Sequence, residues 1–197
     1  MKKAFYILIL ILTVSCKKEK KEINPLVIEF HNKGIEYQFE NKKDSAIVYF
    51  KKALEIQPTD ITTIESLIKI YWINGQPELA LQILKKTPEE IKESNSILIL
   101  KGMTHEKMGK LNEAMELYKK AFKESPIIEY KNEQNLMEFI GYLTLQTIVG
   151  EKDKAMVEFN KLKEKKLTES EKHYVNSIEL IIKNYKSGGY NAIFGNE

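Results

Sequence analysis

A period of about 34 residues constrains this chain more than any other feature. Ala46, Ala80 and Ala114 follow one another at that interval. Several other small, aromatic and proline residues recur at twice the interval, namely Gly34 and Gly102, Tyr37 and His105, Phe50 and Tyr118, Ala53 and Ala121, and Pro58 and Pro126. A unit of this length holds two helices and a turn, and it buries its apolar face only by stacking on further copies. The period predicts an all-α stack of helix pairs and favours binding over catalysis.

Within the first unit, small residues face one another across the two predicted helices. Gly34 and Tyr37 lie on one side of the first helix, three residues apart. Ala46 and Phe50 lie on the inner side of the second helix, and Pro58 closes the unit just past its end. Two antiparallel helices approach closely only where glycine or alanine faces alanine, while aromatic rings fill the gaps between layers.

This pattern resembles the tetratricopeptide repeat (TPR), which has a large residue, glycine and tyrosine in its first helix and alanine, an aromatic residue, alanine and proline in its second. In the first unit these places are taken by Phe30, Gly34, Tyr37, Ala46, Phe50, Ala53 and Pro58. In the third unit they are taken by Leu98, Gly102, His105, Ala114, Tyr118, Ala121 and Pro126. The resemblance implies a TPR-type α-solenoid of antiparallel helix pairs with a C-terminal capping helix.

Residues 25–167 are assigned to the repeats, and a single helix is expected after them. The four units cover about 27–60, 61–88, 95–128 and 136–167, the last after a shift of seven residues. Thr168 and Glu171 form the T-x-x-E capping box that starts a helix, so residues 168–187 are expected to cover the open end of the stack. The tail, 188–197, either docks on the stack and fills its groove or stays loose, and the sequence leaves both open.

The N-terminus has the parts of an export signal, assigned to residues 1–15. Lys2 and Lys3 precede a short apolar run, and the small residue Ser15 precedes Cys16, the single cysteine of the chain. The run ending at Cys16 resembles the lipobox of bacterial lipoproteins, which implies diacylation of this cysteine (a palmitate-type anchor). Residues 16–24 then form the lipidated N-terminus and a charged tether. We expect the bacterial cell envelope, at the outer membrane, with the periplasmic or surface face undecided.

The TPR resemblance also supplies candidate partner-binding residues, since the first helices of such repeats line a concave groove. Carried onto this chain, the candidates are Ile35, Phe39, Lys69, Trp72, Ile73 and Met103. A largely apolar groove suits an amphipathic helix or a hydrophobic peptide. The alternative is that these side chains seal one helix against the next.

Motifs for other chemistry are missing from the sequence. It has no glycine-rich phosphate loop, G-x-S-x-G, H-E-x-x-H or C-x-x-C, so no catalytic residue, metal site or cofactor is predicted. All 31 basic residues are lysine, and arginine is the usual residue for bidentate phosphate and base recognition. Nucleic-acid binding is therefore not expected.

Together these features predict a membrane-anchored TPR scaffold that binds a protein or peptide partner and is not an enzyme. The alternative is a structural component of an envelope complex that associates with further copies of itself as a homo-oligomer. The sequence does not identify the partner or the pathway.

Overall fold

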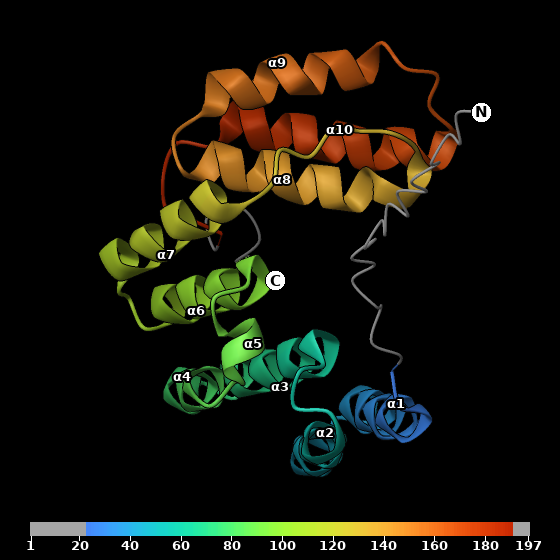
Figure 1. Ribbon diagram of the computed structural model, residues 1–197, viewed down its shortest axis with the longest axis vertical. Helices are drawn as coiled ribbons and strands as arrows, with labels where there is room; N and C mark the ends of the chain where they lie inside the picture. Colours follow the sequence, from blue (N-terminus) through green and yellow to red (C-terminus); the bar gives the residue numbers. More distant parts are fainter. Residues whose placement is uncertain (1–22, 191–197) are drawn as a thin grey trace, which may run out of the picture.

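The computed structural model describes residues 23–190, apart from the side chains of Ser170, His173 and Ser177. The described chain forms successive pairs of helices that stack into a curved array, and it contains no β-strand (Figure 1). The elements are α1 (Pro25–Phe39), α2 (Lys43–Ile56), α3 (Ile61–Ile73), α4 (Pro77–Lys85), α5 (Glu89–Lys92), α6 (Asn95–Lys107), α7 (Leu111–Glu124), the 3-10 turn η1 (Glu133–Asn135), α8 (Leu136–Ile148), α9 (Lys152–Lys163) and α10 (Glu169–Asn184). The predicted all-α solenoid of antiparallel pairs with a capping helix is confirmed.

The same turn reverses the chain within each of the four pairs. One residue adopts a positive φ, and the N–H of the next residue donates to the carbonyl five positions back, which is the Schellman arrangement. The positive-φ residues are Asn41, Gly75, Gly109 and Gly150. Three of them are glycine because a residue without a Cβ adopts this conformation at little cost. The turn fixes the angle at which each second helix returns along the first.

Inside the pairs, an aromatic ring of the second helix packs on a glycine of the first. The ring of Phe50 in α2 covers Gly34 in α1, and the ring of Tyr118 in α7 covers Gly102 in α6. Both rings are completely buried. Burial of a large side chain contributes about 1.5–3 kcal/mol, so the ring–glycine contact is a main source of stability in these pairs.

The second pair is built differently. Ile68 of α3 stands where the first and third pairs have glycine, and it is fully buried. The second helix, α4, ends at Lys85, three residues before Pro88, because proline disfavours helical conformation in the preceding residue. The additional turn α5 then leads the chain into α6, which contacts both α3 and α4.

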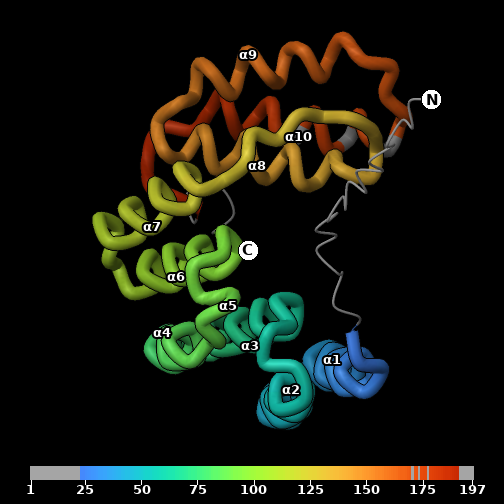
Figure 2. The backbone as a smooth tube through the Cα atoms, viewed as in Figure 1, coloured from blue at the N-terminus to red at the C-terminus, as the bar shows by residue number. Residues whose placement is uncertain are grey.

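The fourth pair and α10 share one hydrophobic core. Between α7 and α8 the chain runs in extended form along the length of α8 (Figure 2), with Ile128 and Tyr130 packed on that core. The capping box at the start of α10 forms as predicted, with Thr168 and Glu171 exchanging hydrogen bonds. The Tyr130 hydroxyl also donates to Glu171 (2.6 Å), so the same carboxylate joins the linking segment to α10.

Candidate functional site

The first helices of the pairs, α1, α3 and α6, lie on the inner side of the curve, and α2, α4 and α7 lie on its outer side (Figure 1). We call the exposed side of α1, α3 and α6 the inner face. Because the pairs repeat at a constant interval in the sequence, equivalent positions recur along it. Ile35, Lys69 and Met103 form one such series.

Two predicted groove residues, Phe39 and Ile73, are open to solvent. They lie one repeat apart and are the last residues of α1 and α3. Phe39 is 87% exposed and Ile73 is 61% exposed. Scattered single apolar residues are common on protein surfaces, but these two occupy the same position of adjacent repeats. They form an apolar pair available to a ligand.

Three other predicted groove residues are packed between helices. Ile35 and Trp72 contact the core formed by the first pairs, and Met103 contacts the core around α6 and α7. The indole N–H of Trp72 donates to Oγ1 of Thr104 (3.3 Å), which links α3 to α6. This geometry favours the alternative interpretation for Trp72, namely that it seals one repeat against the next.

The remaining candidate, Lys69, is exposed and lies one helical turn after Glu65. The two side chains form an ion pair of 2.7 Å. Exposed pairs of this spacing contribute only about 0.3–0.5 kcal/mol, so a ligand can separate them at small cost. Lys69 thus adds an available cation beside the apolar residues of the inner face.

The residue equivalent to Trp72 in the third pair is Glu106. The C-terminal part of the same chain packs against it. One carboxylate oxygen of Glu106 accepts the hydroxyl of Tyr118 (2.6 Å) and the backbone N–H of Tyr190 (2.8 Å). Burial, together with the bond to Glu106, raises the pKa of the Tyr118 hydroxyl well above its ordinary value, so it remains a donor. The sequence left the position of the tail open, and the structure places its first part on α6 and α7.

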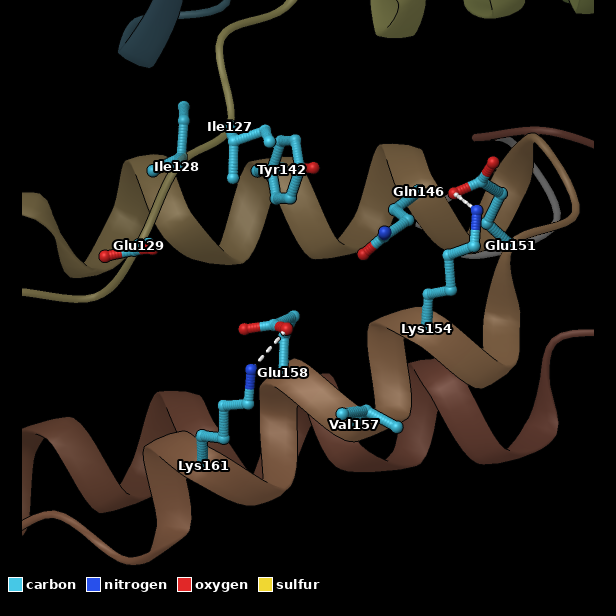
Figure 3. Close-up of a pocket in the computed structure, with 10 residues that line it drawn as sticks. All are labelled: Ile127, Ile128, Glu129, Tyr142, Gln146, Glu151, Lys154, Val157, Glu158 and Lys161. Atoms are coloured by element: carbon cyan, nitrogen blue, oxygen red, sulfur yellow. Dashed lines mark hydrogen bonds and ion pairs between the residues drawn. The ribbon is translucent and has the colours of Figure 1, made fainter.

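A hollow lies away from the inner face, between the segment after α7 and helices α8 and α9 (Figure 3). Its volume is about 440 Å³. Ion pairs on α9 join Glu151 to Lys154 (3.1 Å) and Glu158 to Lys161 (2.7 Å) at its edge. The amide oxygen of Gln146 is buried there and accepts no hydrogen bond from the described residues. This amide oxygen gives the hollow one acceptor for a donor group.

The structure also bears on metal binding and membrane attachment. Within residues 23–190, no cluster of three histidine, cysteine, aspartate or glutamate side chains is arranged to hold a metal ion. In the same range no helix combines the length and apolar character needed to cross a membrane. The signal segment and the lipidation site Cys16 lie outside the described residues.

Comparison with known proteins identifies the repeats. A family model for the tetratricopeptide repeat matches residues 30–60 and 96–127, which correspond to the first and third helix pairs. The chain is also similar to a TPR repeat-containing protein of Methanocaldococcus jannaschii, with 30% identity over 167 residues. That alignment covers 81% of this chain but only 28% of the relative, so the chain spans little more than a quarter of the relative's length.

Proposed function

The chain is a tetratricopeptide repeat protein, and from that premise we propose that it binds a protein or peptide partner through its inner face without catalysing a reaction. Repeats of this family are protein-interaction scaffolds. The observation that supports the inner face is the exposure of Phe39 and Ile73 at equivalent positions of adjacent repeats. Exposed apolar side chains that recur along a repeat surface suit the apolar side of an amphipathic helix or a hydrophobic peptide.

Replacement of the exposed pair tests this proposal. A chain carrying Phe39→Ala and Ile73→Ala is expected to keep its helical content but to lose most of its co-purifying partner. The matched control is Val48→Ala, which removes an exposed side chain from α2 on the outer side. Quantitative mass spectrometry of the material bound to tagged chains measures the loss. Equal partner recovery from the double variant and the control would contradict the role of the inner face.

The proposal includes a lipid anchor at Cys16 that holds the scaffold at the outer membrane of a bacterial envelope. Its support is the sequence alone, in which a positive and apolar leader precedes this cysteine and a charged tether follows it. Two acyl chains would give stable membrane attachment, whereas a single chain binds only weakly. Cys16→Ser should move the protein from the membrane fraction to the soluble fraction, and an unchanged distribution would reject the anchor.

Self-association is the second candidate, supported by apolar side chains at the start of the stack. Ile23, Leu26 and Ile28 are each about half exposed (48%, 49% and 48%). A second copy that covered them would extend the stack, because repeat arrays bury their end faces against a neighbour or a cap. Light scattering of the purified chain distinguishes the two functions. A stable dimer that becomes monomeric in the Leu26→Lys variant would favour self-association, whereas a monomeric wild type would favour binding of a different protein.

A further inference from the structure

The chain folds back after α10, so that residues 185–190, which we call the docked segment, lie against α6 and α7 (Figure 1). Tyr190 is only 8% exposed, and its ring meets the ring of Tyr118 edge-on with centroids 5.1 Å apart. Edge-to-face pairs at this separation are favourable beyond the area that they bury. The docked segment therefore inserts an aromatic anchor between repeats.

Glu106 binds the backbone of the docked segment as well as organising the pocket for its ring. Its Oε1 accepts the N–H of Tyr190 while it holds the hydroxyl of Tyr118 in place. Hydrogen bonds to a carboxylate are shorter and stronger than those between neutral groups. Because the N–H belongs to the main chain, any peptide that presents an aromatic residue in this conformation supplies the same donor.

Glycine is the favoured residue before the anchor. Gly189 has a φ of +70°, and an ideal Cβ at this position would overlap the Glu106 carboxylate, lying 2.6 Å from its Cδ. The N–H of Gly189 donates to the hydroxyl of Tyr185 (2.9 Å), which holds the turn closed. A larger residue would thus be strained by its backbone and would separate the Glu106 carboxylate from the N–H of Tyr190.

The position of this contact connects it to partner binding. Glu106 takes the same place in the third repeat as Trp72 takes in the second and Gln38 in the first. The TPR resemblance assigns this first-helix position to the groove, although its member in the second repeat, Trp72, packs against the next repeat. A partner that uses the third repeat has to meet the docked segment there.

We propose that Glu106 and Tyr118 form a recognition site for a peptide in which glycine precedes an aromatic residue, and that the docked segment is its resident occupant. This inference rests on the proposed function. A partner peptide of the same chemistry displaces Tyr190 and takes over its bond to Glu106 and its contact with Tyr118.

Exchange requires the resident occupant to release a small set of contacts. Lys186 and Ser187 of the docked segment are exposed, its two tyrosines and Gly189 contact α6 and α7, and Lys152 donates to the carbonyl of Tyr185 (3.4 Å). A segment tethered next to its site competes at an effective concentration of the order of millimolar. Removal of the internal competitor should accordingly strengthen the binding of an external peptide by about tenfold or more.

The test uses a fluorescein-labelled peptide with the sequence of residues 183–197 and the full chain in mild detergent. Fluorescence anisotropy measures peptide binding to wild type and to the variants Tyr190→Ala, Gly189→Ala and Lys186→Ala. The first two variants release the docked segment, and Lys186→Ala is the matched control because it alters an exposed side chain of the same segment. Circular dichroism checks the helical content, and Gly189→Ala provides the result if Tyr190→Ala does not fold.

We expect the two releasing variants to bind the peptide at least about ten times more tightly than wild type and the Lys186→Ala control. A peptide carrying Gly189→Ala or Tyr190→Ala is expected not to bind. Equal affinity for all four chains, no binding to any of them, or undiminished binding of the altered peptides would overturn the inference. If any of these results accompanies partner recovery that still depends on Phe39 and Ile73, the ligand class is wrong while the proposed function stands.

Discussion

Substitution of Gly34 by alanine tests how the first helix pair is held together. An ideal Cβ on Gly34 would lie 2.5 Å from Cε1, 2.6 Å from Cδ1 and 2.9 Å from Cζ of Phe50. Carbon atoms in contact prefer about 3.5–4.0 Å, so the ring must retreat by roughly 1 Å. Phe50 is completely buried, so its ring can retreat only by displacing the side chains packed around it.

The magnitude follows from two opposing effects. Overpacking of a buried site costs about 1–3 kcal/mol. Because the added Cβ would meet three ring atoms, we expect a cost of about 3 kcal/mol, at the upper end of this range. Alanine has a higher helix propensity than glycine by about 1 kcal/mol, which offsets part of that cost. We therefore expect Gly34→Ala to lower the free energy of unfolding by about 2 kcal/mol, which for a chain of this size lowers the melting temperature by about 4–8 °C.

Gly141 provides a matched control, because it lies within α8 and an added Cβ there would meet no atom within 4 Å. Gly141→Ala should gain helix propensity alone and raise the free energy of unfolding by about 1 kcal/mol. Urea denaturation followed by circular dichroism measures both variants, with fluorescence of Trp72 as a second probe of the neighbouring repeat. A Gly34→Ala chain as stable as wild type, or stabilised like Gly141→Ala, would refute the ring-on-glycine account.

Three further predictions concern a turn, a titration and the inner face. Asn41 has a φ of 57° where the other turns have glycine. Asn41→Gly should therefore raise the free energy of unfolding by up to about 1 kcal/mol and raise the melting temperature slightly, and a lower melting temperature would contradict this. The bond from Tyr130 and the backbone N–H of Thr168 lower the pKa of Glu171; its stabilising effect is present above the ordinary pKa of about 4.3 and is lost as pH falls through the lowered value. Melting temperatures of wild type and Tyr130→Phe should therefore differ at pH 7, and the difference should shrink as the pH falls through the lowered pKa of Glu171; a constant difference over the acid range would contradict the assignment. In urea titrations Trp72→Ala should destabilise by about 2 kcal/mol or more because it removes a contact between repeats, whereas Phe39→Ala should change stability by less than about 0.5 kcal/mol; equal effects would contradict their placement.

The helix pairs were predictable because their determinants are local and recur. In the first three pairs, a glycine or asparagine at each turn repeats at a fixed interval, as do the ring–glycine contacts Gly34–Phe50 and Gly102–Tyr118, so the sequence itself displays them. Exposure at the inner face was less predictable, because it depends on the neighbouring repeat. Trp72 is packed because Thr104 lies opposite its indole, a pairing that the period does not indicate.

The docked segment shows where sequence reasoning stops. Tyr190 meets Glu106 across a separation of 84 residues, and no periodic pattern connects the two. The available signal was the pair Gly188 and Gly189 followed by an aromatic residue, which indicates a turn but not the surface on which it docks. Only the three-dimensional course of the chain brings this turn to the third repeat.

Photo-crosslinking in living cells shows whether a partner contacts the inner face of the stack. A photoreactive residue would replace Ile73 of the inner helix α3, and in a matched chain it would replace Val48 of the outer helix α2 (Figure 1); both side chains are exposed. If a partner binds the inner face, position 73 should give a defined crosslinked species that contains a second protein. Position 48 should give no crosslinked species of the same mass. Crosslinking of the same protein from position 48 alone, or from neither position, would contradict binding through the inner face.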